Sequence, residues 1–139
     1  MISISISVFL SAVTLAIAAI HILWGIGYWW PIRSEEVLVR AVVGFKGATR
    51  MPGPIPCALV AVALIFAANF PWFPYGILRT IGLWTCAVVF LSRGLFPYLP
   101  FWRRMTPQKP FATLDRTRYG PLCLLLGAGY VILATGVLQ

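Results

Sequence analysis

The feature that most constrains the fold is an uncharged run of residues from Val8 to Trp30. A helix crosses the hydrocarbon core of a bilayer with roughly 20 apolar residues, so this run is long enough to span a membrane. It also contains His21, the only histidine of the chain. A polar ring at that depth needs a partner inside the protein, because lipid offers none. The sequence therefore predicts a membrane-spanning first helix with an inward-facing polar position.

Small and polar side chains recur along this run at intervals that alternate between four and three residues, which is the spacing of one helix face. Helices in lipid associate through close packing of small residues and through hydrogen bonds between polar side chains. We therefore expect this small-residue face to be turned toward the other helices. It comprises Ser7, Ser11, Thr14, Ala18, His21, Gly25 and Tyr28. The residues expected to face lipid or other neighbours are Leu10, Ile17, Ile20 and Leu23.

Composition extends this prediction to the whole chain. Of its 139 residues, 60% are hydrophobic and 10% charged, whereas a soluble domain has about 25% charged residues. The length allows one domain, residues 1–139. We predict an all-α, four-helix transmembrane bundle with spans at about 5–30, 55–71, 76–95 and 121–138. All eleven prolines fall at or outside the ends of these spans, as expected of residues that break a helix interior.

The net charge of +8 is concentrated in two of the three connections. Four basic residues lie between spans one and two, and six lie between spans three and four, so both sets share one side of the membrane. By the positive-inside rule that side is the cytoplasm, which puts both termini outside a bacterial inner membrane. Nucleic acid is not an expected partner, because the basic residues flank spans and do not line a water-facing groove. The two sets are Arg33, Arg40, Lys46 and Arg50, and Arg93, Arg103, Arg104, Lys109, Arg116 and Arg118; Arg79 alone is expected near the outer headgroups.

The first span could be mistaken for a cleaved signal peptide, because Ala16-Ile17-Ala18 has the small-x-small pattern of a cleavage site. No basic segment precedes the apolar run, however, and the run continues to Trp30. We therefore expect the first span to be retained.

Two segments between the spans carry further signals. Ser34, Glu35 and Glu36 read as a helix start followed by a short amphipathic helix on the cytoplasmic face, with a valine-rich, strand-like turn as the alternative. Residues 93–119 form a long, proline-punctuated connection that mixes aromatic residues with arginines. Connections of that length are usually functional or mobile, so we expect it to lie along the membrane interface.

The three cysteines lie in three different predicted spans and imply no disulfide framework; they are Cys57, Cys86 and Cys123. Buried thiols of this kind usually act as small apolar residues. A soft-metal site formed by His21, Cys57 and Cys123 is conceivable. The chain has no Cys-x-x-Cys pair and no second histidine, so we predict no metal site and leave the cofactor unknown.

Two stretches carry a family resemblance. The first is His21-x-x-Trp24, and the second is Asp115-x-x-x-Tyr119-x-Pro121-Leu122-Cys123-Leu124; Arg93-Gly94 is a third recurrent pair. Together they resemble a bacterial family of small four-helix integral membrane proteins that is described only as a domain of unknown function. Gly120 stands where the family pattern has a serine. The resemblance implies the fold and the topology, and it implies no activity.

His21 and Asp115 are the two residues for which the sequence leaves the most roles open. At a rise of 1.5 Å per residue, His21 lies roughly 13 Å inside the cytoplasmic boundary. There it can hydrogen-bond across helices, or serve as a ligand, haem or proton-relay residue. Asp115 can cap the last helix, pair with an arginine, or act as a general acid or base.

These residues lead to three functional hypotheses. The first is a non-enzymatic protein that binds a lipid-like ligand or acts as an accessory subunit of a membrane complex. Its expected partners are membrane lipids and either a second copy, in a homodimer, or a larger membrane complex. The second is an enzyme on a lipid, quinone or other apolar substrate, with His21 and Asp115 as catalytic residues. The third is half of a dimeric transporter. The predicted ligand-binding residues are His21, Trp24, Tyr28, Arg93, Arg116, Arg118 and Tyr119.

Overall fold

Every regular element in the computed structural model, which describes residues 1–137, is helical. The α-helices are α1 (Ile2–Gly25), α2 (Glu35–Val42), α3 (Pro54–Asn69), α4 (Ile77–Leu95), α5 (Pro100–Met105), α6 (Phe111–Leu114) and α7 (Gly120–Thr135). Two 3₁₀ turns, η1 (Phe70–Trp72) and η2 (Phe96–Tyr98), extend α3 and α4, and a π-helical turn, η3 (Asp115–Tyr119), joins α6 to α7.

Four helical segments are long and apolar enough to cross a membrane, namely Ile2–Gly25, Pro54–Trp72, Ile77–Tyr98 and Phe111–Thr135. The predicted all-α fold class with four spans is therefore confirmed. Helix α2 follows the first span, so the short helix is present and the strand-like alternative is wrong. The end predicted for the fourth span, residue 138, lies outside the described residues.

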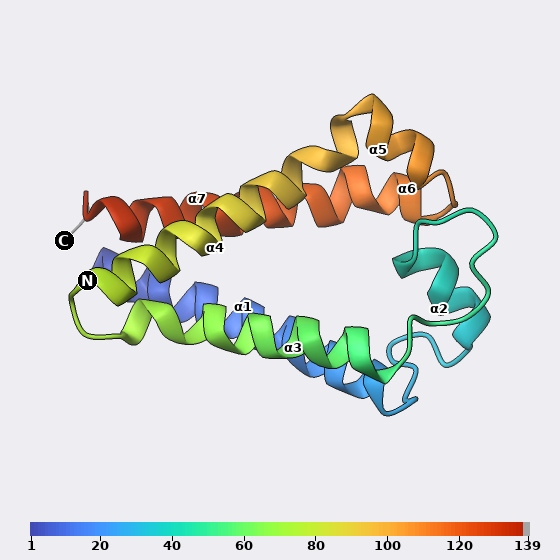
Figure 1. Ribbon diagram of the computed structural model, residues 1–139, viewed down its shortest axis with the longest axis horizontal. Helices are drawn as coiled ribbons and strands as arrows, with labels where there is room; N and C mark the ends of the chain where they lie inside the picture. The colour runs from blue at the N-terminus through green and yellow to red at the C-terminus, as the bar shows by residue number, and fades with distance from the viewer. Residues whose placement is uncertain (138–139) are drawn as a thin grey trace.

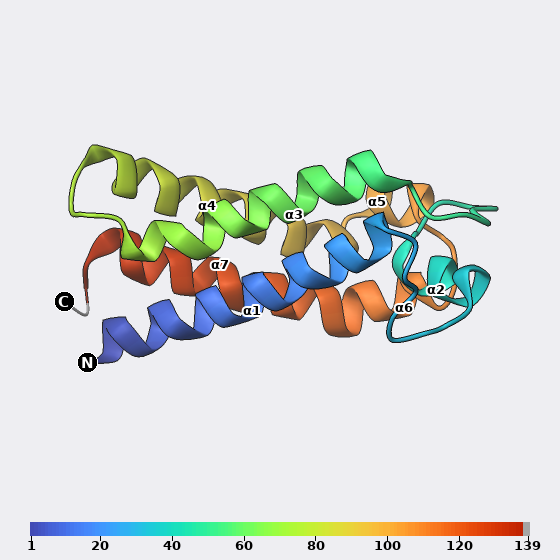
Figure 2. The same cartoon turned by 90° about the horizontal axis from the view of Figure 1, so that it is seen from below.

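The four long helices form two closely packed pairs, α1 with α3 and α4 with α7. Figure 1 shows the pairs lying close together where α1 begins and α7 ends, and diverging toward α2, α5 and α6. Figure 2, turned by 90°, shows α2, α5 and α6 gathered at that same far end. We call the end formed by residues 26–53 and 96–114 the basic end, and the opposite one the terminal end.

Polar and aromatic contacts join the two pairs toward the terminal end. Tyr130 on α7 is fully buried, and its hydroxyl donates to the Ala67 carbonyl of α3 at 2.9 Å. Its ring stacks on Phe90 of α4, with centroids 5.6 Å apart. Within the other pair, the Ser11 hydroxyl of α1 donates to the Ala68 carbonyl at 2.6 Å. Both hydroxyls are hydrogen-bonded, so neither is left unpaired in the apolar interior. Polar side chains are tolerated inside a bundle of this composition for that reason.

Replacing Tyr130 with phenylalanine is expected to lower the free energy of unfolding by about 1 kcal/mol, because one buried hydrogen bond between the pairs is lost while the stacked ring remains. The measurement is reversible unfolding in mixed detergent–SDS micelles. Tyr28→Phe is the matched control, because that tyrosine is 55% exposed. Equal stability of the two variants would contradict a role for the Tyr130 hydroxyl.

The small-residue face of α1 is turned toward the other helices over most of its length. Ser7, Thr14 and Ala18 are buried, and Ser11 bonds to α3. Gly25 lies against Cys57 of α3, at ordinary contact distance for a Cβ placed on the glycine. The physical reason is the one given by the sequence pattern: small side chains let the α3 backbone approach closely.

The structure specifies one detail of the first span and corrects another. Leu10, expected to face lipid or other neighbours, is 0% exposed and lies in the core close to Gly129 of α7, because α1 meets the second pair as well as α3. The helix ends at Gly25, short of the predicted residue 30. Gly27 adopts φ 83°, a left-handed conformation that favours glycine, and the chain turns there. Tyr28 consequently lies outside the helix and is exposed.

The two basic connections meet at one end of the bundle, as the charge pattern predicts (Figure 1). The Gln108 amide donates to the Gly44 carbonyl at 3.1 Å, which ties the second connection to the first. Phe111 fills the space beside Gly44, where a Cβ would come within 2.4 Å of the phenylalanine ring. Residues 93–119, expected to be a loop, are instead largely helical, because η2, α5, α6 and η3 lie within them.

Arg79 lies near the start of α4 and is only 8% exposed. Its Nε donates to the Pro71 carbonyl at 3.4 Å, and its guanidinium lies 4.6 Å from the centroid of the Tyr75 ring. The arginine therefore folds back over the turn between α3 and α4, and its position near the outer headgroups stays a prediction.

Candidate functional site

Asp115 lies inside one continuous helical segment, residues 111–135, at its only π-helical turn within the described residues. In that turn the Gly120 amide donates to the Asp115 carbonyl five residues before it. Such turns are rare and occur frequently at functional sites. Asp115 therefore does not cap the helix, and of the roles left open by the sequence its position favours pairing with a buried partner.

Gly120 and Pro121 explain why the helix widens at this point. A Cβ on Gly120 would lie 2.8 Å from the Asp115 carbonyl oxygen, so glycine permits the tight approach. Pro121 has no N–H, and the carbonyl five residues before it, that of Arg116, is left without a helical donor. The Tyr98 hydroxyl fills this place, donating to the Arg116 carbonyl at 2.9 Å. Pro121 thus lies inside a helix, which corrects the prediction that all prolines lie at or beyond span ends.

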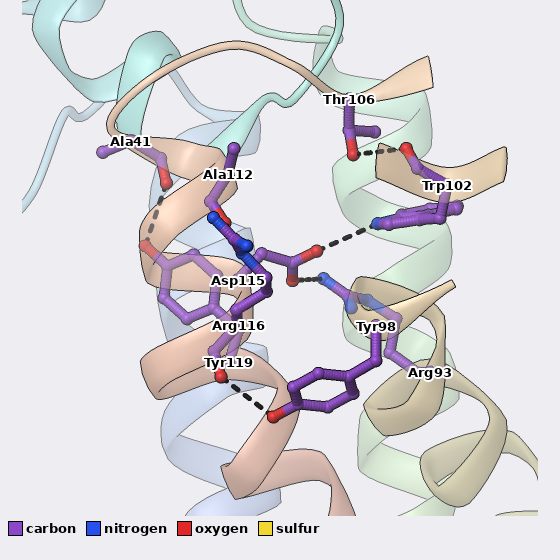
Figure 3. A network of polar contacts seen from close by, with 9 residues as sticks. All are labelled: Ala41, Arg93, Tyr98, Trp102, Thr106, Ala112, Asp115, Arg116 and Tyr119. Atoms are coloured by element: carbon purple, nitrogen blue, oxygen red, sulfur yellow. Dashed lines mark hydrogen bonds and ion pairs between the residues drawn. The ribbon is translucent and has the colours of Figure 1, made fainter. Parts of the chain in front are cut away.

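Both oxygens of the Asp115 carboxylate have partners from other helices, as Figure 3 shows. Arg93, in the last turn of α4, donates from Nη2 to Oδ1 at 2.6 Å. Trp102, on α5, donates from Nε1 to Oδ2 at 2.9 Å. Asp115 is 2% exposed, so its charge is removed from water and offset by the guanidinium. The pairing with an arginine that the sequence suggested is thus formed, with Arg93 as the partner.

Arg93 has less complete hydrogen bonding than Asp115. Its guanidinium lies 5.6 Å from the centroid of the Trp102 ring, a distance that allows a cation–π contact. Its Nη1 is buried without a hydrogen-bond partner among the described residues. Tyr119 completes the surroundings, because its hydroxyl donates to the Ala41 carbonyl at 2.9 Å and so attaches α2 to the π-helical turn.

A small cavity of about 120 Å³ opens beside the Asp115 carboxylate. Its two basic residues come from different elements, Arg103 from α5 and Arg116 from η3. Arg116 is held by its backbone bond to Tyr98 and by its Nε, which donates to the Ala112 carbonyl at 3.2 Å. The full lining is Pro97, Trp102, Arg103, Thr106, Ala112, Asp115 and Arg116.

The charge of this cavity is positive, because the protein has no carboxylate left to neutralise it. The three acidic residues are all engaged elsewhere. Glu36 pairs with Arg40 at 2.6 Å, Glu35 accepts from the Met51 amide at 3.1 Å, and Asp115 is bound as described. Within residues 1–137, neither cavity arginine forms an ion pair. An anion from outside the chain is the natural complement of two such guanidinium groups.

The predicted site residues on α1 lie apart from this centre. The His21 Nδ1 is 2.8 Å from the Ile17 carbonyl of its own helix, and its ring lies 5.1 Å from that of Trp24. The Trp24 Nε1 in turn donates to the Trp30 carbonyl at 2.8 Å. The histidine thus satisfies one ring nitrogen locally, whereas the sequence suggested a bond across helices. It does not line the cavity beside Asp115.

Of the predicted ligand-binding residues, the structure brings together Arg93, Arg116 and Tyr119 around Asp115, and Arg118 is exposed outside the cavity. The sequence did not single out Trp102 among the aromatic residues of 93–119, so its bond to the carboxylate was missed. Arg103 and Thr106 were also missed as cavity residues. The available signal was the Trp-Arg-Arg sequence at 102–104, but only the fold of residues 96–110 brings it against α7.

The cysteines do not gather with His21 into a metal site. Cys57 lies against Gly25, on the opposite helix pair from Cys86 and Cys123. Across residues 1–137, no group of three or more His, Cys, Asp or Glu side chains is placed to hold a metal ion.

Fold and site together define an all-helical protein with four segments able to span a membrane and a buried ion pair beside an arginine-lined cavity. Residues 14–130 match the family described as Protein of unknown function (DUF3995), and the chain belongs to this family. This confirms the resemblance seen in the sequence. No curated protein and no solved structure gives a significant match.

Proposed function

We propose that this chain is a non-enzymatic membrane protein that binds an amphiphile with an anionic head group at its basic end. The observation that carries the proposal is the cavity beside Asp115, which is lined by two arginines without acidic partners, Arg103 and Arg116. Bidentate contacts from guanidinium to phosphate or carboxylate are among the strongest hydrogen bonds in proteins. The ion pair between Arg93 and Asp115 fixes α4 to α7 beneath this space.

Exposed apolar side chains in the segment that carries the cavity residues provide a place for the hydrocarbon part of the ligand. Between 39% and 53% of each is exposed, and they lie close in sequence to Pro97, Trp102 and Arg103; they are Leu95, Tyr98, Leu99, Phe101 and Met105. A head group bound by the arginines would leave its acyl chains against these residues and the surrounding lipid. This arrangement favours an amphiphile over a wholly water-soluble anion.

Charge distribution supports an orientation for this site. Seven of the eleven basic residues lie in the basic end, and three more, Arg93, Arg116 and Arg118, lie in the helical turns next to it. Under the positive-inside rule this end faces the cytoplasm of a bacterial inner membrane. The ligand would then come from the cytoplasmic leaflet, whose anionic lipids are attracted to such a surface.

The enzyme hypothesis gains no support from the arrangement of its two residues. It requires His21 and Asp115 to share a cavity, whereas the cavity beside Asp115 is lined without the histidine. Both carboxylate oxygens already accept hydrogen bonds from Arg93 and Trp102, which favours a structural ion pair over a general base. No observation favours the transporter hypothesis.

The test is lipid binding by the double variant R103Q/R116Q. We expect it to lose about tenfold or more in affinity for phosphatidylglycerol, because two charge-assisted contacts are removed. The measurement is native mass spectrometry of the detergent-solubilised protein titrated with that lipid. The matched control is R33Q/R50Q, which removes the same charge from two exposed positions at the same end. Equal losses in both variants would show a diffuse surface effect and contradict a site.

A further inference from the structure

We infer that the head group bound at the basic end is a terminal phosphate monoester, such as that of phosphatidic acid or another phosphorylated lipid. This rests on the proposed function and specifies its ligand. The feature that carries it is the match between one small cavity, two guanidinium groups without counter-ions, and the charge and size of a monoester.

The first argument is charge. A phosphate monoester carries about −1.5 to −2 at neutral pH, because its second pKa is near 6, whereas a phosphodiester carries one negative charge. Arg103 and Arg116 contribute two positive charges to the cavity. Asp115 also lines the cavity, but the Arg93 guanidinium, with Nη2 2.6 Å from Oδ1, offsets the negative charge of this carboxylate. A dianion therefore balances the cavity, and a monoanion leaves one positive charge uncompensated.

The second argument is the number of acceptor oxygens. Each guanidinium can form two parallel hydrogen bonds to neighbouring oxygens. A monoester offers three terminal oxygens, so Arg103 and Arg116 can each engage two of them while sharing one. A diester offers two non-bridging oxygens and places a substituent where the third would be. The Arg116 Nε is already used by the Ala112 carbonyl, which leaves its two terminal nitrogens for the ligand.

The third argument is space. A cavity of about 120 Å³ has room for about four water molecules at roughly 30 Å³ each. That is enough for a phosphate group and well below the roughly 300–1,000 Å³ of pockets that enclose a whole small-molecule ligand. Pro97 forms an apolar wall, the Trp102 indole N–H is taken by Asp115, and the Thr106 hydroxyl donates to the Trp102 carbonyl. None of these three residues has a free donor for a glycerol or ethanolamine substituent, so the cavity favours the phosphate itself.

The experiment compares phosphatidic acid with phosphatidylglycerol of the same acyl chains, each at low fraction in nanodiscs of phosphatidylcholine containing the full chain. Binding is followed by native mass spectrometry, with inorganic phosphate as a soluble competitor. We expect phosphatidic acid to bind about tenfold more tightly, as one additional charge-assisted hydrogen bond predicts. The preference should vanish in R103Q/R116Q and persist in R33Q/R50Q.

The outcomes separate the inference from the function on which it rests. Equal binding of the two lipids would overturn the monoester and leave the anionic amphiphile standing. Absence of binding by both lipids would overturn the proposed function as well. Inorganic phosphate that displaces phosphatidic acid only at much higher concentration supports a lipid monoester. Inorganic phosphate that binds as tightly as phosphatidic acid would overturn the lipid source.

Discussion

Replacing Asp115 with asparagine is expected to lower the free energy of unfolding by about 3 kcal/mol. The carboxylate is 2% exposed and holds Arg93 at 2.6 Å, so the variant leaves a largely desolvated guanidinium without its counter-charge. Removing one member of a buried pair costs about 3–5 kcal/mol, and the lower end applies because a third of the Arg93 side chain is exposed. Asparagine keeps the shape and can still accept from the Trp102 indole, so the change isolates the charge.

The control for this variant is Glu36→Gln, which breaks the exposed pair with Arg40. Such surface pairs contribute about 0–1 kcal/mol, so its stability should stay close to that of the original protein. A second variant, Asp115→Asn with Arg93→Met, removes both charges and should recover part of the loss, because no unpaired ion remains. Reversible unfolding in mixed detergent–SDS micelles gives all three values. A loss below about 1 kcal/mol for Asp115→Asn would show that the pair is hydrated and not a buried centre.

The four spans could be predicted from the sequence because hydropathy and charge act over whole segments. The uncharged run to Trp30 and the clustering of basic residues required only the physics of lipid and water. The residues at which the helices begin and end were harder to predict from the sequence. The positive φ of Gly27 terminates α1 early, and the π-helical turn lets α7 begin upstream of Pro121. The end of α1 and the start of α7 both depend on backbone geometry. A glycine or proline at one position allows that geometry but does not require it.

The candidate site was predictable in part, for a related reason. Asp115 was predicted as a site residue, and pairing with an arginine was one of the three roles that the sequence left open. That the partner would be Arg93 and not Arg116 or Arg118 could not be predicted, because it depends on how α4 packs against α7. Trp102 and Arg103 reach the site only because residues 96–110 fold into short helices above it. Contacts between segments distant in sequence are the part that local patterns do not encode.

Replacing Gly94 with alanine is expected to destabilise the protein by about 1–2 kcal/mol and to weaken lipid binding as well. A Cβ at this position would lie 2.7 Å from side-chain atoms of Leu124 and 2.8 Å from its backbone nitrogen. A backbone atom in a packed helix cannot rotate away, so α4 and α7 must separate, and overpacking of this kind typically costs about 1–3 kcal/mol. The gain in helix propensity from glycine to alanine, about 1 kcal/mol, offsets part of this cost.

The consequence for the site follows from the position of Gly94 next to Arg93. If α4 moves away from α7, the 2.6 Å contact between Arg93 and Asp115 lengthens, and the arginine-lined cavity above it changes shape. The control is Gly25→Ala, where a Cβ meets Cys57 at 3.4 Å, an ordinary contact. Gly94→Ala should lower both the free energy of unfolding and the affinity for phosphatidic acid. Gly25→Ala should lower neither. Normal binding by a destabilised Gly94→Ala protein would mean that the cavity does not depend on the spacing of α4 and α7.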